Sequence, residues 1–477
     1  MTTRRTVLKT SAAAVAGIVV GLSPFNEIFA GEKFASRRPP LKKRKFTSDA
    51  VESTIASVQK DIDDPELRWL FGNCFPNTLD TTVETGVRAG KPDTFVITGD
   101  IHAMWLRDST AQVWPYLPLL AEDKKLQRLI AGVIHRQSYC IAIDPYANAF
   151  NKGKEGSYWQ KDLTAMKPEL HERKWEIDSL CYPVRLAYGY WKITGDVSVF
   201  DSEWETAMMK VIDTFRDQQR MIDKGKYSFR RNTTTPYDTL PLDGYGNPTR
   251  PNGLIHSAFR PSDDACIFPM LIPSNLFAIV TLRHLSELLS NFSSDSERAA
   301  ECDAIADTIE QTVHASAVME HGKRGLIYAY EIDGFGNALF MDDANVPSLL
   351  SLPYLGICRS DDLLYQRTRE FVLSEDNPYF FKGTSAEGIG GPHVGLDMIW
   401  PLGIIMRALT SDDDEEIRSC LRMLKTTHAG TGFMHESFHK NDPAHFTRKW
   451  FAWANTLFGE LVLKVHHERP HLLKGNL

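Results

Sequence analysis

Residues 274–290 read SNLFAIVTLRHLSELLS, and the spacing of their apolar side chains decides the fold. The apolar positions recur three or four residues apart, which is the spacing of one face of an α-helix. The clearest members of this stripe are Phe277, Val280, Leu285 and Leu288. The same periodicity predicts further helices at 48–59, 103–120, 123–139, 177–193, 198–221, 294–313, 361–373, 394–409, 412–425 and 451–467.

Short polar turns join these predicted helices in pairs. At 193–196, 359–361 and 409–412, one helix ends and an Asp or Ser is in place to cap the next. Longer segments lie between the pairs, and they are rich in Trp, His, Arg and Asp, which favours a functional role. Because no linker divides residues 50–477, we expect one all-α toroid of helical hairpins whose long loops meet at one end.

The composition is that of an ordinary globular protein. Of 477 residues, 43% are hydrophobic and 24% are charged, and the formal net charge is −7. The chain is therefore long enough to bury a large core, and it lacks the basic surface that a nucleic-acid partner would require. The seven cysteines are scattered without a C-x-x-C motif, and we interpret them as mostly buried free thiols.

The N-terminus has the pattern of an export signal. Arg4, Arg5 and Leu8, followed by a short apolar run, fit a twin-arginine signal peptide over 1–30 with cleavage after Ala30. The run of about twelve residues is too short to span a bilayer, although an uncleaved anchor is an alternative. This pattern predicts a bacterial protein that the twin-arginine translocase exports to the periplasm or the cell exterior, with no membrane contact afterwards.

Two further segments complete the predicted domain organisation. Residues 31–46 contain the run Lys-Lys-Arg-Lys at 42–45 and are predicted to form a solvated basic linker. Residues 47–477 are predicted to form the folded domain.

The segment Trp-Leu-Arg-Asp-Ser at 105–109 combines an indole ring, a guanidinium and a carboxylate. The apolar C–H face of a pyranose ring stacks on an indole, and its hydroxyls bond to planar Arg and Asp groups. We therefore predict that Trp105, Arg107 and Asp108 contact a sugar. The alternative is a helix start, in which Asp108 is a cap and Trp105 belongs to the core.

A pair of adjacent acidic residues, Asp263 and Asp264, follows Arg260 in a second polar cluster. Cleavage of a glycosidic bond requires two carboxyl groups, one of them a protonated acid. Mutual repulsion and ion pairing with Arg260 can raise the pKa of one Asp and lower that of the other, so this pair is the candidate for the acid. The alternative is that one Asp caps a helix that begins near Ala265.

Glu436 is the candidate for the second carboxyl group, as a general base. It lies between His435 and Ser437, just after Gly430 and Gly432, which allow the backbone to approach a ligand closely. Asp397 is the reserve candidate for this role.

The same stretch also matches H-E-x-x-H, a zinc metalloprotease signature, through His435 and His439. That motif requires a helix to place both histidines on one face. Glycines precede the motif closely and Asn-Asp-Pro follows it at 441–443, so we expect a loop and not a zinc site.

Weaker candidates lie in two other segments. Trp175 and Asp178 open a predicted helix and are candidate sugar contacts, with helix capping by Asp178 as the alternative. His393 and Asp397 could bind sugar hydroxyls or form a buried pair. Arg260 and His435 are included as candidate contacts because of their neighbours.

The motifs around these residues resemble those of glycoside hydrolase family 125, exo-acting α-mannosidases that need no metal. The matching segments are TGDI at 98–101, AMWLRDS at 103–109, RPSDDA at 260–265, LIPSN at 271–275 and MHESF at 434–438. They occur in the family's order, and the resemblance covers about 63–467.

The resemblance implies an (α/α)6 barrel, no metal or organic cofactor, and removal of terminal α-1,6-linked mannose with inversion. It implies that the general acid is in the Asp263–Asp264 pair, with Asp263 favoured, and that Glu436 is the general base. Inversion places two such carboxyls roughly 6.5–9.5 Å apart, with room for the attacking water. The implied partner is an α-mannoside oligosaccharide or N-glycan. The alternatives are another inverting α-glycosidase, a glycoside phosphorylase or a non-catalytic glycan-binding protein.

Overall fold

The structure, a computed structural model, describes residues 34–293 and 295–477. The chain divides into two compact units, Met1–Ala35 and Ser36–Leu477, and the second unit contains all the elements described below. The predicted signal peptide at 1–30 lies outside the described residues.

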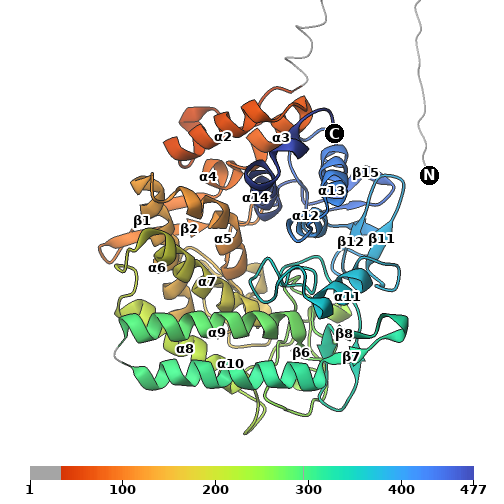
Figure 1. The fold of residues 1–477 in the computed structure, drawn as a ribbon. Coiled ribbons are helices and arrows are strands. Elements are labelled where there is room, and N and C mark those ends of the chain that lie inside the picture. The colour runs from red at the N-terminus through yellow and green to blue at the C-terminus, as the bar shows by residue number, and fades with distance from the viewer. Residues whose placement is uncertain (1–33, 294) are drawn as a thin grey trace, which may run out of the picture. The chain divides into compact units, whose positions relative to one another are not determined.

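The second unit is mainly helical, with short strands between the helices (Figure 1). Its α-helices are α2 (Asp49–Asp61), α3 (Pro65–Cys74), α4 (Asn77–Thr81), α5 (Leu106–Val113), α6 (Lys124–Ile143), α7 (Ile177–Thr194), α8 (Ser202–Gln218), α9 (Ile272–Phe292), α10 (Ser296–Ser316), α11 (Leu363–Val372), α12 (Pro401–Leu409), α13 (Asp414–Thr426) and α14 (Ala452–Glu468). Short 3-10 helices are η1 (Leu41–Lys43), η2 (Trp114–Leu119), η3 (Tyr158–Lys161), η4 (Pro236–Asp238), η5 (Leu242–Gly244), η6 (Gly322–Arg324) and η7 (Pro470–Leu473).

Helices α5, α7, α9, α12 and α14 form an inner ring and are buried along most of their length. Within the ring, α14 packs on α5, α5 on α7, α7 on α9, and α12 on α14. Buried turns at 346–357 complete the ring: Tyr182 of α7 donates to the Val346 carbonyl, and Arg185 donates to that of Tyr354. Figure 1 shows α2, α6, α8, α10 and α13 farther from the centre of this unit. The arrangement is an (α/α)6 barrel, as expected.

The outer and inner helices begin differently. A side-chain oxygen caps the first turn of each outer helix, from Ser48 (α2), Asp123 (α6), Asp201 (α8), Asp295 (α10), Asp362 (α11) and Asp413 (α13). The inner helices have no side-chain cap and begin after Trp105, Glu176, Leu271, Trp400 and Phe451. Large aromatic and acidic side chains therefore gather at the N-terminal end of the inner ring.

Short antiparallel strands connect the loops of this unit. They are β1 (Val83–Arg88), β2 (Lys91–Val96), β3 (Met104–Trp105), β4 (Ala149–Phe150), β5 (Leu170–Glu172), β6 (Met270–Leu271), β7 (Val318–Glu320), β8 (Leu326–Tyr328), β9 (Glu331–Ile332), β10 (Ala338–Leu339), β11 (Phe380–Lys382), β12 (Glu387–Ile389), β13 (Met398–Ile399), β14 (Ser437–His439) and β15 (Asp442–Thr447). The sheet β3–β4–β5 pairs Trp105 with Ala149 and Ala149 with Glu172. In the sheet β13–β14–β15, Ser437 pairs with Thr447. These two sheets support the site described below.

Two predicted helices differ from the structure in their bounds. The helix expected over 394–409 begins only at Pro401, because Gly395 and Asp397 have φ values of +89° and +65° that no helix accommodates. The helix expected over 103–120 is α5 followed by the 3-10 helix η2, in which Pro115 and Pro118 remove backbone donors. The helices α3 and α4 lie outside the predicted set.

The basic segment before the domain is partly packed on the domain and partly exposed. Arg38 is only 9% exposed at its side chain, and it pairs with Glu52 at 2.5 Å and with Asp80 at 2.7 Å. The compact unit begins at Ser36. Arg38 thus packs on the domain, whereas Lys42, Lys43 and Lys45 of the same segment are exposed. The seven cysteines are free, and all but Cys358 are buried, as predicted.

Candidate active site

The N-terminal end of the inner ring borders a cavity of about 440 Å³, a size typical of small-molecule sites. Its lining includes the predicted residues Trp105, Arg107, Asp108, Asp263, Asp264, His393 and Glu436. These side chains come from separate parts of the chain, and only the closed ring brings them together.

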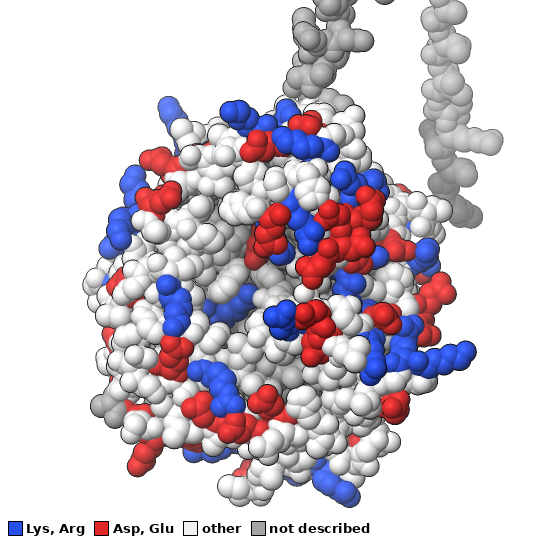
Figure 2. All heavy atoms as spheres, in the orientation of Figure 1, with Lys and Arg blue, Asp and Glu red and all other residues white. Residues whose placement is uncertain are grey.

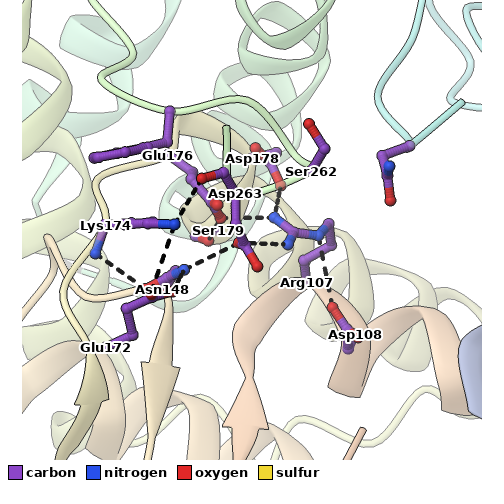
Figure 3. A network of polar contacts seen from close by, with 12 residues as sticks. Arg107, Asp108, Asn148, Glu172, Lys174, Glu176, Asp178, Ser179, Ser262 and Asp263 are labelled. Atoms are coloured by element: carbon purple, nitrogen blue, oxygen red, sulfur yellow. Dashed lines mark hydrogen bonds and ion pairs between the residues drawn. The ribbon is translucent and has the colours of Figure 1, made fainter. Parts of the chain in front are cut away.

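Arg107, in the first turn of α5, organises one side of the cavity (Figure 3). Its Nη1 donates to Glu176 Oε2 at 2.6 Å and to Asp178 Oδ2 at 3.0 Å, and its Nη2 donates to Asp263 Oδ1 at 3.3 Å. Arg107 is buried, and Glu176 and Asp178 have no exposed surface. A buried planar guanidinium that bonds three carboxyl groups fixes their positions before a ligand binds.

Asp263 lies in a tight turn, where its N–H donates to the Arg260 carbonyl at 2.9 Å. Its φ is +67°, an unusual value for a residue with a Cβ. Lys174 Nζ donates to its carbonyl oxygen at 2.7 Å, and Asn148 Nδ2 donates to its Oδ1 at 3.2 Å (Figure 3). Burial alone would raise the pKa of Asp263, but the charges of Arg107 and Lys174 outweigh it and hold this pKa below its usual range.

Asp264 has a different environment from its neighbour. Its Oδ1 bonds to His393 Nδ1 at 2.9 Å. Burial opposes the charged form of His393, but the hydrogen bond to Asp264 and the charges of Asp264, Asp263 and Glu436 raise the pKa of His393 to about 9. His393 is therefore a cation at neutral pH that pairs with Asp264. The Asp263 side chain is the more accessible of the two acids, 23% exposed against 2%.

Glu436 borders the same cavity from the loop before β14. Thr447 Oγ1 donates to its Oε2 at 2.9 Å, and Arg448 Nη1 donates to its Oε1 at 3.3 Å. Gly432, with φ +79°, allows the tight approach of this loop, because a Cβ there would lie 2.7 Å from the Trp69 ring. Both carboxylate oxygens of Glu436 are thus held in place.

Asp108 is a buried acid that lines the cavity. Its nearest cation is Arg107, whose Nε lies 3.6 Å from Asp108 Oδ2. Burial raises the pKa of Asp108; Arg107 opposes this rise and Asp263 adds to it, and the result is about 6.

Aromatic rings form apolar walls of the cavity. Trp105 lies 5.3 Å from His171 between ring centroids, and Phe451 lies between Trp400 and Trp453 at 6.2 and 6.1 Å. Within the described residues, the buried Nε1 atoms of Trp105 and Trp400 have no hydrogen-bond partner. A pyranose presents both an apolar face and hydroxyl groups, so it suits a wall of this kind.

Comparison with known proteins places this site in a family. The model of the metal-independent α-mannosidase family, GH125, matches residues 64–463. The chain belongs to this family. A GH125 chain is a glycoside hydrolase, so the expectation of an α-mannosidase and the resemblance that suggested it are confirmed.

Two similar proteins extend the comparison. A structure from Streptococcus pneumoniae, described as a metal-independent α-mannosidase in a non-productive complex with α-1,6-mannobiose, is 42% identical with a TM-score of 0.85, and the match covers 89% of this GH125 chain and all of that one. The meiotically up-regulated gene 157 protein of the fission yeast Schizosaccharomyces pombe is 44% identical over 459 residues, which cover 92% of this chain and 90% of the relative.

The yeast relative corrects the expected location of this GH125 protein. We expected a bacterial protein in the periplasm or the cell exterior, but the relative comes from a eukaryote, so a bacterial exported origin is not supported. The residues that suggested export lie outside the described part of the chain. Among the described residues, no helix is both long enough and apolar enough to cross a membrane.

Five predicted substrate contacts do not line the cavity: Trp175, Asp178, Arg260, Asp397 and His435. Trp175 is fully buried, and its Nε1 donates to the His256 carbonyl at 2.7 Å. Asp178 is fully buried and bonds to Arg107, so it supports a lining residue without reaching the cavity. The apolar and acidic residues that begin α7 thus belong to the packing behind the site.

The other three have structural partners of their own. Arg260 is buried and its Nε donates to Glu331 at 2.6 Å. Asp397, the reserve candidate for the base, forms an ion pair with Lys440 at 2.6 Å outside the cavity lining. His435 stacks on Phe446 with ring centroids 3.7 Å apart.

The zinc interpretation of the H-E-x-x-H motif is wrong. The motif lies on a loop and the strand β14, not on a helix. His435 stacks on Phe446, whereas His439 stacks on His445 with centroids 5.6 Å apart. Across 34–293 and 295–477, no group of three His, Cys, Asp or Glu residues is arranged to hold a metal ion.

Several lining residues were not predicted from the sequence: Trp159, Glu172, Lys174, Arg231, Tyr237 and Arg448. Arg231 bonds to Asp162 and Glu172 at 2.6 and 2.7 Å, and its guanidinium lies 3.6 Å from the centre of the Trp159 ring. Arg231 lies in one of the long segments between the predicted helix pairs, 231–259, and this position was a usable signal. Lys174 and Arg448 had no signal beyond their closeness in sequence to other candidates.

Proposed function

We propose that this chain is an exo-acting, inverting α-1,6-mannosidase that hydrolyses terminal non-reducing mannose from mannose-rich glycans, including N-glycans. The observation that carries the proposal is that Asp263 and Glu436, which are far apart in the sequence, border one cavity in a chain of an α-mannosidase family. The α-1,6 linkage is supported by the mannobiose described for the S. pneumoniae relative. The catalytic domain comprises 47–477 together with the packed residues before it.

In this mechanism Asp263 protonates the glycosidic oxygen, and Glu436 removes a proton from the water that attacks the anomeric carbon from the opposite face. The C–O bond to the leaving sugar breaks as the new C–O bond to water forms, and an α-mannoside yields β-mannose. We assign the acid to Asp263 because Asp264 is held in an ion pair by His393 and is less accessible. Neither a metal nor an organic cofactor takes part.

The remaining lining residues serve recognition. Trp105 provides a stacking face, and Arg107, Asp108 and His393 provide donors and acceptors for sugar hydroxyls. Mannose differs from glucose by its axial 2-hydroxyl, and a polar group placed to bond it supplies discrimination. Acidic and basic side chains are interspersed on the face in Figure 2, and a neutral glycan needs no surface of a single sign.

A panel of mannobioses of different linkage, with NMR detection of the anomer first released, tests the proposal. We expect hydrolysis of α-1,6-mannobiose with β-mannose as the first product. Release of α-mannose would exclude inversion, and the absence of hydrolysis for every linkage would indicate a glycan-binding protein. Formation of mannose 1-phosphate only in the presence of phosphate would indicate a phosphorylase.

A further inference from the structure

Three acidic side chains accept hydrogen bonds from the guanidinium of Arg107, and a fourth, Asp108, lies 3.6 Å from its Nε (Figure 3). Arg107 Nη1 bonds both Glu176 and Asp178, and Nη2 bonds Asp263. Glu176 and Asp178 have no exposed surface. Three ionised carboxylates around one buried cation would repel one another strongly, so such a cluster retains a proton on one member.

The contacts of Glu176 make it one of two members of the cluster, with Asp178, that can carry the proton. Its Oε2 accepts hydrogen bonds from Arg107 at 2.6 Å and from Ser179 Oγ at 2.8 Å. Its buried Oε1 receives no hydrogen bond within the described residues. Burying an ionised oxygen without a hydrogen bond costs free energy, whereas a protonated Oε1 can donate a hydrogen bond. The Glu176 carboxyl interacts with that of Asp263, which can accept this proton.

Asp178 Oδ1 likewise has no hydrogen-bond partner within the described residues, and burial raises the pKa of Asp178, so the choice between Asp178 and Glu176 depends on the position of each group. Asp178 lies in the first turn of the 18-residue helix α7, where the helix dipole favours a negative charge. Asp263 accepts hydrogen bonds from Arg107 and Asn148, and Lys174 lies beside it. Burial, together with the charges of Asp263 and Asp178, raises the pKa of Glu176 well above its usual range despite Arg107, whereas the pKa of Asp263 is lowered.

This arrangement leaves the proposed general acid ionised in the free enzyme. We propose that Glu176 is a positioning residue that stores the proton which Asp263 delivers to the leaving oxygen. The inference rests on the proposed role of Asp263 as the acid. Glu176 does not line the cavity and acts only through Asp263.

The proton transfers balance as follows. When substrate binds, the proton on Glu176 Oε1 passes to the Asp263 carboxylate, and the neutral Asp263 carboxyl then gives this proton to the leaving glycosidic oxygen and becomes a carboxylate again. Glu176 then carries the negative charge, which Arg107 and Ser179 stabilise at Oε2. Glu436 takes one proton from water in the same reaction. Solvent afterwards returns a proton to the pair through Asp263, the exposed member, and Glu436 loses its proton to solvent.

Other charged or titratable groups face this pair from neighbouring elements, and one of them is His171 in β5. Asp108 follows Arg107 in α5, Asp178 lies in α7, Lys174 precedes α7, and His393 approaches from the 390–397 loop. A change in pH dependence is therefore assigned to Glu176 only by comparison of variants.

The leaving group separates proton storage from a purely structural role. Hydrolysis of α-1,6-mannobiose needs a proton at the leaving oxygen, whereas 2,4-dinitrophenyl α-mannoside does not, because dinitrophenolate leaves as an anion. For Glu176→Gln, which keeps the shape of the side chain but has no proton to transfer, we expect kcat on mannobiose to fall about 10- to 100-fold. This is less than the roughly 10²- to 10⁴-fold contribution of general acid catalysis, because Asp263 is still present. We expect kcat on the dinitrophenyl substrate to change by less than about threefold. The alkaline limb of the mannobiose profile should also move to lower pH.

Two companion variants make the result decisive. Asp263→Asn should also lose kcat on mannobiose, by a larger factor than Glu176→Gln, and retain kcat on the dinitrophenyl substrate. If it loses activity equally on both substrates, the assignment of Asp263 as the acid is wrong, and the inference about Glu176 is overturned with it. Asp263→Asn can lose activity on mannobiose alone while Glu176→Gln loses activity equally on both substrates, or on neither. That result would overturn the role of Glu176 and leave the assignment of Asp263 intact. Ser179→Ala removes only the donor that stabilises ionised Glu176 and serves if Glu176→Gln does not fold. We expect a several-fold loss confined to mannobiose, and an equal loss on both substrates would overturn the inference.

Discussion

Lys174 Nζ bonds the backbone carbonyl oxygen of Asp263, at 2.7 Å, and thereby fixes the turn that carries this acid. The same ammonium bonds Asp238 at 2.7 Å and is 4% exposed at its side chain. One buried lysine thus both supports the left-handed backbone of Asp263 and adds a positive charge beside its carboxylate.

Replacing Lys174 should therefore affect both activity and stability. For Lys174→Met, which keeps the length of the side chain, we expect kcat to fall at least about tenfold because Asp263 loses its fixed position. The free energy of unfolding should fall by about 3 kcal/mol, because buried acidic groups lose their partner. Steady-state kinetics and urea unfolding measure the two effects, and an unchanged kcat would show that the turn holds its shape without Lys174.

The proposed base gives a second prediction. Glu436→Gln should lower kcat about 10²- to 10⁴-fold, because the amide cannot accept a proton from water, while mannose still binds. Calorimetric titration with mannose checks binding, and hydrolysis of both mannobiose and the dinitrophenyl substrate checks catalysis. In contrast to Asp263→Asn, the activated leaving group should not restore this variant. Near-normal turnover would remove Glu436 from the mechanism.

The buried Asp108 predicts a pH effect on binding. With a pKa of about 6 it is protonated below this pH, and as a carboxylate above it the side chain can accept hydrogen bonds from sugar hydroxyls. We expect KM for mannobiose to fall as pH rises from 5 to 7. Asp108→Asn should abolish this step and raise KM about tenfold, which corresponds to the loss of one hydrogen bond to a charged group. A pH step that persists in the variant would assign the titration to another residue.

The His393–Asp264 pair predicts a pH effect on stability. The pKa of His393 in the folded protein, about 9, lies above the 6.5 of the free side chain. The pair therefore stabilises the fold fully below pH 6.5, and this contribution disappears as pH rises through 9. His393→Gln should lower the Tm more at pH 6 than at pH 10. Equal shifts at both pH values, measured by calorimetry, would contradict a charged His393.

Treatment with a chelator should not affect the reaction, because the proposed chemistry is carried out by carboxyl groups. We expect the rate of mannobiose hydrolysis to be the same before and after extensive dialysis against EDTA. Loss of activity that added zinc or calcium restores would require a different mechanism.

Local sequence patterns predicted most of the fold. The apolar stripe of residues 274–290 lies within α9, and the polar turns at 359–361 and 409–412 lead to the caps Asp362 and Asp413. Helix periodicity and capping depend on residues within about four positions of each other, so the sequence shows them directly. The sequence also identified Trp105, Arg107 and Glu436 as cavity residues, because their clusters combine groups that a sugar requires.

Only the tertiary structure decided which of the polar residues meet. Arg107 and Asp263 are 156 positions apart and bond to each other, whereas Arg260, three residues before Asp263, bonds to Glu331 away from the cavity. The burial of Glu176 and the hydrogen bond from Lys174 to the Asp263 carbonyl also depend on closure of the ring. Helix formation is set by neighbouring residues, but the partner, the burial and hence the charge of an acidic side chain are set by segments that meet only when the ring closes.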